Sequence, residues 1–174
     1  MSRQVKLTLV LEDLEVGDEW ESPCRTVTEA DVVNFAGVSG DFNSIHMDHH
    51  TAARGPFRRP IAHGLLGLAI ASGLAASSPQ VDTVAFLAIN DWKFLRPIFF
   101  GDTIHVMTRV LSTEPKSRGR RGIVTWYRRI VNQDGVTVQE GTAQTLVRAR
   151  ARGGRGDEGD PTDHDSAGRS SQHD

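Results

Sequence analysis

An acid, an amide and an imidazole lie close together in one short segment of the chain. Asp41, Asn43 and His46 fall within the sequence GDFNSIH. If the segment after Asn43 forms one helical turn, His46 lies on the same face as Asn43. A carboxylate and an imidazole held this close can grip one water molecule and exchange protons with a substrate. The same spacing also suits a simple turn, capped by Asp41 and Asn43, with His46 as a surface residue.

About twenty residues later, a His–Gly pair precedes the most apolar segment of the chain. His63 and Gly64 lead into LLGLAIASGLAA, which is too continuously apolar for a surface helix and indicates a buried one. Gly64 lies at the expected helix start, where backbone N–H groups lack intrahelical partners and the helix dipole is positive. Such an N–H group can stabilise an oxyanion, and a glycine lets a ligand approach the backbone closely. The alternative is an ordinary helix start with a closely packed glycine.

Together the two segments resemble the hydratase-2 motif of the MaoC-like (R)-specific enoyl-CoA hydratases, a branch of the hotdog-fold superfamily. The stretch FAGVSGDFNSIHMD is similar to the family motif in order and spacing, and PIAHGLLGLAIASGL resembles the family's central helix. Ser44 stands where the family usually has proline, which would only stiffen the turn. The resemblance implies an α+β fold, a single hotdog domain in which a curved antiparallel sheet wraps a long central helix.

The resemblance also implies a role for each motif residue. Asp41 and His46 would hold the catalytic water, and the Gly64 N–H would polarise a thioester carbonyl. Three further polar residues would position the substrate or the acid–base pair: Asn43, His63 and Ser72. The implied reaction is the reversible syn addition of water to a trans-2-enoyl-CoA, which gives a (3R)-3-hydroxyacyl-CoA. The substrate would be an acyl-CoA or acyl-carrier-protein thioester, with no cofactor.

Two other functions stay open on the same residues. A hotdog acyl-CoA thioesterase would use Asp41 to activate water against the thioester carbon, but it gains little from His46 beside that acid. A non-catalytic acyl-CoA-binding hotdog protein would need neither group, so the presence of both weighs against it.

A histidine-rich cluster invites a metal interpretation. His46 and His50 have the i, i+4 spacing that suits two ligands on one helix face, and Asp48 and His49 lie between them. The chemistry implied by the motif needs no metal, so we predict no metal site.

Arginines and aromatic residues near the motif suggest contacts to the rest of a substrate. Arg58 and Arg59 could contact the phosphates of a CoA tail, although a solvated loop explains them more simply. Four aromatic residues could line an acyl pocket or belong to the core: Trp92, Phe94, Phe99 and Phe100.

Composition limits the classes of function. The chain has 174 residues and a net charge of −2, so it lacks the basic field that nucleic-acid binding needs. The single cysteine, Cys24, excludes an internal disulfide framework and favours a reducing compartment; we expect it to be half-buried. The N-terminus lacks the features of a signal peptide, and the apolar run 65–76 is too short to span a bilayer. We therefore expect a cytoplasmic protein without a membrane partner.

The domain organisation follows from hydrophobic patterning. We expect an N-terminal arm or extra strand over 1–13, the hotdog domain over 14–147, and a polar, disordered tail over 148–174. An open sheet edge gains from being covered, and hotdog proteins commonly pair by their sheets, so we expect a homodimer or higher homo-oligomer.

Periodicity and turn signals predict the elements. We expect helices at three places: from an N-cap at Thr28 to about 37–40, over about 47–53, and over about 61–76. Strands are expected over 20–27, 84–89, 91–96, 104–108, 123–131 and 136–147, with a polar hairpin loop over 114–122. The continuous apolar run 84–89 is typical of a strand that is buried on both faces.

Overall fold

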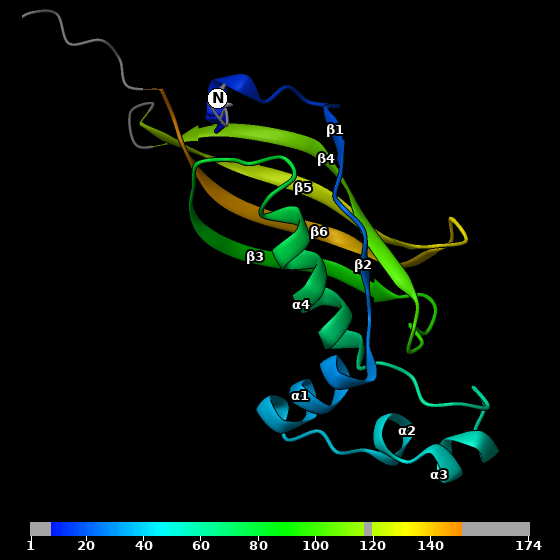
Figure 1. Ribbon diagram of the computed structural model, residues 1–174. Coiled ribbons are helices and arrows are strands. Elements are labelled where there is room, and N and C mark those ends of the chain that lie inside the picture. Colours follow the sequence, from blue (N-terminus) through cyan, green and yellow to red (C-terminus); the bar gives the residue numbers. More distant parts are fainter. Residues whose placement is uncertain (1–7, 117–119, 151–174) are drawn as a thin grey trace, which may run out of the picture.

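One curved antiparallel sheet and one helix make up most of the structure, a computed structural model that describes residues 8–116 and 120–150 (Figure 1). The helix is α4, Gly64–Ala75, and it lies in the concave side of the sheet. The six strands are β1 (Glu19–Glu21), β2 (Arg25–Thr26), β3 (Thr83–Phe94), β4 (Thr103–Lys116), β5 (Arg121–Asn132) and β6 (Thr137–Arg148). Their spatial order is β1-β4-β5-β6-β3, with β2 also paired to β4. The predicted α+β class is confirmed.

Three short helices gather at the N-terminal end of α4, beyond one end of the sheet (Figure 1). They are α1 (Glu29–Ser39), α2 (Ser44–Met47) and α3 (His49–Arg54). The predicted capping box forms at the start of α1: Thr28 Oγ1 accepts from the Asp31 backbone N–H, and Asp31 Oδ2 accepts from the Thr28 backbone N–H at 2.9 Å. The single helix expected over 47–53 is instead α2 and α3, because Asp48 caps α3 and starts a new helix there.

The core lies between α4 and the sheet. On α4, Leu66, Ile70 and Ala71 are buried against strand residues such as Ile104 and Ile130. A second cluster surrounds Trp126 and includes two residues from outside the expected domain, Leu11 and Ala149, together with Leu14 at its start. Within residues 8–116 and 120–150, no helix is long and apolar enough to cross a membrane.

Strand β3 differs most from expectation. It is one strand with register irregularities, rather than two strands over 84–89 and 91–96, and Asp91 within it has a φ of 51°. The prediction that 84–89 is buried on both faces is wrong for the single chain. Phe86 and Leu87 are 48% and 46% exposed, because β3 lies at the sheet edge.

Several element boundaries also move. The strand expected over 20–27 is divided into β1 and β2 around Pro23, where Cys24 is exposed instead of half-buried. Parts of the loop predicted over 114–122 belong to β4 and β5, whose pairing extends to Lys116 and Arg121; residues 117–119 lie outside the described part.

The flanking segments are partly built into the domain. Leu11–Asp13 forms a 3₁₀ helix whose Leu11 packs on Gly122, where a Cβ would lie 2.4 Å from a Leu11 methyl. At the other end, Arg148 belongs to β6, and Arg150 pairs with Asp13. The expected tail therefore begins later than 148; residues 1–7 and 151–174 lie outside the described residues.

Candidate active site

The turn after α1 presents the Asp41 carboxylate to solvent. Gly40 ends α1 with a φ of 75°, a left-handed conformation that glycine adopts without a Cβ penalty. The Asp41 backbone N–H donates to Ser39 Oγ at 3.2 Å, and Asp41 Oδ1 accepts from the Asn43 backbone N–H at 3.2 Å. The carboxylate is half-exposed, with Oδ2 left free by this turn.

Asn43 positions the acid and the imidazole by indirect contacts. Its side-chain Oδ1 accepts from the Ile45 backbone N–H at 3.1 Å and so caps α2, the single helical turn that carries His46. Its backbone N–H holds Asp41, as described above. One residue thus fixes the Asp41 turn and the start of the His46 helix together.

His46 points its free nitrogen at Asp41. His46 Nδ1 lies 2.8 Å from the Ile61 carbonyl oxygen, which can only accept, so Nδ1 carries a proton and donates. His46 Nε2 lies 3.9 Å from Asp41 Oδ2. This separation is too long for a direct hydrogen bond, but one water molecule can bond to both groups.

His63 lies beneath this pair and is almost completely buried, at 3% exposure. Its Nε2 donates to the Asp41 backbone carbonyl at 2.9 Å. Its ring stacks on the His46 ring, with centroids 3.9 Å apart, and contacts Phe35 on another side. His63 therefore braces both Asp41 and His46.

Gly64 begins α4 as expected, with His63 as its N-cap. A Cβ at Gly64 would lie 2.8 Å from Cδ1 of Phe94, so only glycine fits beneath this ring without a shift. The Gly64 carbonyl accepts from Gln139 Nε2 at 3.0 Å, and Gln139 Oε1 accepts from Trp92 Nε1 at 3.0 Å. Two strands of the sheet thus hold the first turn of α4.

Sequence reasoning missed Gln139. The alternation of strand residues could have revealed it. Gln139 points to the same face of β6 as Gly141, Ala143 and Thr145, which face α4. Its amide therefore interrupts an inner face that is otherwise small or apolar. A buried amide of this kind requires a hydrogen-bond partner.

A cavity of about 360 Å³ joins His46 to Gly64. Most of its walls are apolar, as is usual for a small-molecule site. It is lined by His46, Phe57, Ile61, Ala62, Gly64, Phe94, Leu95, Arg96, Pro97, Ile98 and Gln139. Of the four aromatic residues considered for an acyl pocket, only Phe94 lines this cavity; Trp92 and Phe100 pack against the core.

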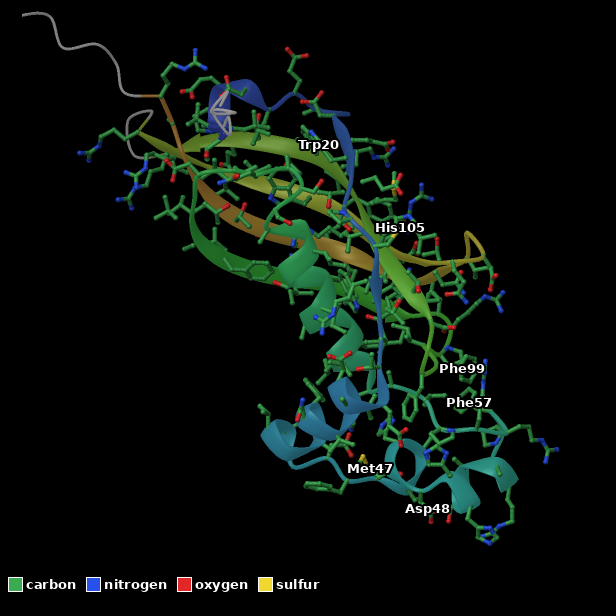
Figure 2. All side chains as sticks on the ribbon, viewed as in Figure 1. Trp20, Met47, Asp48, Phe57, Phe99 and His105 are labelled. Atoms are coloured by element: carbon green, nitrogen blue, oxygen red, sulfur yellow. The ribbon has the colours of Figure 1, made fainter. Side chains whose placement is uncertain are left out.

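A second cavity of about 510 Å³ adjoins the first and shares Arg96 and Pro97 with it. Arg59 lines the second cavity, with its guanidinium 3.7 Å from the ring centre of Phe99. Figure 2 shows Phe57 and Phe99 in this region, between the start of β4 and helices α2 and α3. Arg58 lies outside both cavities, and Arg96 is a cation that the sequence did not single out.

Ser72 does not join the site within one chain. It lies eight residues after Gly64 on α4, about 12 Å along the helix axis, and is exposed. It lines a separate cavity with Phe86, Arg128 and Thr145.

The histidine-rich cluster does not form a ligand set. His49 Nε2 contacts Glu29 Oε1 at 3.1 Å, and His50 contacts Arg54. Among the described residues, donor atoms of Asp41, His46 and His63 lie within 4.8 Å of one another instead. His63 Nε2 is engaged with the Asp41 carbonyl and His46 Nδ1 with the Ile61 carbonyl. That leaves His46 Nε2 and the Asp41 carboxylate free within the cluster, while His63 Nδ1 is buried without a hydrogen-bond partner among the described residues.

Comparison with known proteins identifies the family of this chain. The sequence matches the family model described as "MaoC like domain" over residues 14–130. The chain belongs to the MaoC-like domain family. The hotdog fold is confirmed by a Mycobacterium tuberculosis protein with a double hotdog fold, which aligns with a TM-score of 0.74 at 20% identity over 86% of this chain and 47% of that one.

Several relatives are more similar in sequence than this fold neighbour. The (R)-specific enoyl-CoA hydratase of Aeromonas caviae is 33% identical over 76% of this chain and 94% of the relative. The MaoC-like dehydratase of Rhodospirillum rubrum has a TM-score of 0.74 and 34% identity, covering 82% of this chain and 98% of that one. Protein MaoC of Klebsiella aerogenes is 38% identical over 55% of this chain, but the match spans only 28% of that longer protein.

Proposed function

We propose that this MaoC-like protein is an (R)-specific enoyl-CoA hydratase/3-hydroxyacyl-CoA dehydratase. The observation that carries the proposal is that His46 and Gly64, the first residue of α4, line one apolar cavity, while the Asp41 carboxylate lies 3.9 Å from His46 Nε2. Relatives of similar length are named hydratases or dehydratases, which supports the same class of reaction.

Each group has a task in the hydration direction. The water oxygen bonds to C3 of the enoyl group while Asp41 accepts one proton of that water. The electrons of the C2–C3 double bond move toward the thioester, where the Gly64 N–H stabilises the enolate oxygen. Protonated His46 then gives the proton on Nε2 to C2. Proton transfer from Asp41 to His46 restores both groups, so the net reaction adds one water.

The proposed substrate is a CoA thioester. Arg96 lies where the two cavities meet, and Arg59 is held over Phe99 in the second cavity. These cations would contact CoA phosphates once the acyl group occupies the first cavity. Two acids also line the second cavity. The Asp102 carboxylate accepts from the Phe99 N–H and from Gln133 Nε2, and Asp134 Oδ2 accepts from Gln133 Nε2 at 3.4 Å.

We also propose that the working form is a homodimer that pairs through β3. This strand is an open edge, and its exposed apolar residues lie on both of its faces: Val84, Phe86, Leu87 and Ile89. An exposed apolar edge strand is a template for pairing with another chain, and a second copy would cover it.

One assay tests the activity and separates the alternatives. The purified full chain is incubated with crotonyl-CoA while enoyl-thioester absorbance and free thiol are followed. Hydration removes the absorbance without releasing thiol, which is the expected result. Thiol release would favour the thioesterase, and loss of neither signal with retained binding would favour a non-catalytic acyl-CoA-binding protein.

Variants link the activity to the site. Asp41→Ala and His46→Ala should each lower the hydration rate by more than about a hundredfold, the usual contribution of a positioned acid or base. His50→Ala is the matched control, because His50 contacts Arg54 on the surface and does not line the cavity. A double Asp41→Ala/His46→Ala variant that retains full rate would exclude this mechanism.

A further inference from the structure

Arg128 brings a positive charge into the helix-facing side of the sheet, away from the proposed active site. It lies on β5 between Trp126 and Ile130, which are both buried. Its Nε is shielded from solvent and has no hydrogen-bond partner among the described residues. Burial lowers the pKa of Arg128 to about 10, so the guanidinium remains charged near neutral pH.

Arg128 lines a cavity of about 140 Å³ between β5, β6, β3 and the C-terminal part of α4. Every other lining residue of this cavity is uncharged. Ser72 brings a hydroxyl from α4, and Thr145 is held in place because its Oγ1 accepts from Trp126 Nε1 at 2.8 Å. Phe86 forms an apolar wall on the edge strand.

The fold offsets this charge only in part. The C-terminal end of α4 borders the cavity at Ala75 and Ala76 and contributes about half of a negative charge. A buried ion without a full counter-charge is costly, and proteins normally pair such groups or bind a ligand with them. Arg128 is only half-buried as a residue, but its Nε has no partner among the described residues, and an anion or polar acceptor that entered the cavity would supply one.

We propose that this cavity binds a small aliphatic carboxylate, with its oxygens on the Arg128 guanidinium and the Ser72 hydroxyl. Guanidinium and carboxylate groups match in a planar, bidentate geometry. The volume is several times the share of one water, which is about 30 Å³, so a carboxylate with a short chain fits. The apolar walls at Phe86 and Pro79 suit the aliphatic part.

The carboxylate has two chemical sources. It is either a free carboxylic acid or the far end of a dicarboxylic acyl chain whose thioester lies at Gly64. The cavities at Gly64 and Ser72 share no lining residue and lie about 12 Å apart along the axis of α4, so the second source requires a chain long enough to run beside the helix. Only the second source rests on the proposed hydratase function.

Thermal unfolding of the full chain tests the site itself. Sodium butyrate should raise the Tm relative to sodium chloride at the same ionic strength, since a ligand that binds only the folded state stabilises it. Arg128→Met should abolish the butyrate-specific rise, and Arg128→Lys should weaken apparent binding at least about tenfold, because it keeps the charge but loses the bidentate fork. The matched control is Arg129→Met, on the neighbouring, exposed residue of the same strand.

The outcomes are decisive. A butyrate-specific rise in Tm that occurs in the wild type and in Arg129→Met, but not in Arg128→Met, supports the site. No butyrate-specific rise, or an equal rise in all variants, overturns it. Sedimentation velocity gives a further check: if Arg128→Met converts a dimer to a monomer and butyrate has no effect on wild type, the partner of Arg128 is a second copy of the chain and the proposal is wrong.

Kinetics distinguish the two sources. Wild type and Arg128→Met are compared on two ten-carbon 2-enoyl-CoA substrates, one ending in a carboxylate and one in a methyl group. A fall of at least about tenfold in kcat/KM, confined to the carboxylate-ended substrate, assigns the site to the acyl chain. Equal kinetics together with the butyrate-specific Tm rise assigns it to a free carboxylate. If wild type hydrates neither substrate nor crotonyl-CoA, the hydratase function fails while the Tm result still decides the site.

Discussion

The imidazole rings of His46 and His63 stack with their centroids 3.9 Å apart and their planes 31° apart. Each ring donates to a different backbone carbonyl, His46 to Ile61 and His63 to Asp41. The stack and these two hydrogen bonds fix both rings, so His63 braces the Asp41 turn beside the His46 ring.

This relationship predicts different effects for two substitutions at His63. His63→Phe keeps a ring against His46 but removes the donor to the Asp41 carbonyl, so kcat should fall roughly tenfold, the equivalent of one hydrogen bond. His63→Gln keeps an N–H donor near the same place and should retain more activity than His63→Phe. Steady-state hydration kinetics with crotonyl-CoA measure both. If the Phe variant is the more active one, the ring stack matters more than the Asp41 bond.

Two glycines of α4 should respond in opposite ways to alanine. At Gly64, a methyl group would meet the Phe94 ring and force it or the helix start to move, so kcat/KM should fall by at least roughly tenfold. At Gly73, a Cβ would meet nothing within 4 Å, so Gly73→Ala should stabilise the protein by up to about 1 kcal/mol and leave activity unchanged. Urea unfolding and hydration kinetics on both variants check the pair. A fully active Gly64→Ala enzyme would remove the argument for close approach at this amide.

The proposed dimer predicts a change of mass when a charge is placed on β3. Leu87→Lys introduces a cation on the open edge and should convert the protein to a monomer, because lysine on an edge strand blocks pairing. Leu111→Lys is the control. Leu111 is also partly exposed, but it lies on β4, which pairs with β1 on one side and β5 on the other. Sedimentation velocity gives the masses. A monomeric wild type, or a dimeric Leu87→Lys variant, would contradict pairing through β3.

The capping box of α1 predicts a pH dependence of stability. Hydrogen bonds from the Thr28 backbone and side chain, together with Arg25, hold the pKa of Asp31 below its ordinary value of 3.8. The folded-state pKa is thus lower than the unfolded one. The carboxylate therefore stabilises the fold above the unfolded value and loses this contribution as pH falls through the folded one.

Asp31→Asn should accordingly cost about 1 kcal/mol in free energy of unfolding near neutral pH, the usual value of a helix cap. The difference from wild type should shrink when urea unfolding is repeated at pH values that fall progressively below 3.8. A difference that stays constant across this range would mean that the charge of Asp31 does not contribute.

The sequence alone determined the features that depend on near neighbours in the chain. The capping box at Thr28, the helical turn that carries His46 and the start of α4 at Gly64 were all predicted. Each is fixed by hydrogen bonds or sterics within a few residues, so residue type and spacing suffice. The motif that spans these residues also identified the family before any coordinates.

Tertiary structure decided everything that depends on which distant segments meet. The stacking of His63 on His46, the Gln139 bond to Gly64 and the exposed position of Ser72 each join, or separate, elements that are far apart in sequence. The apolar run in β3 suggested burial, yet the strand order left it at an edge, because burial depends on the neighbouring strand and not on the strand's own residues. For the same reason, the position of Arg128 in the strand pattern did not predict that the fold would shield its Nε from solvent.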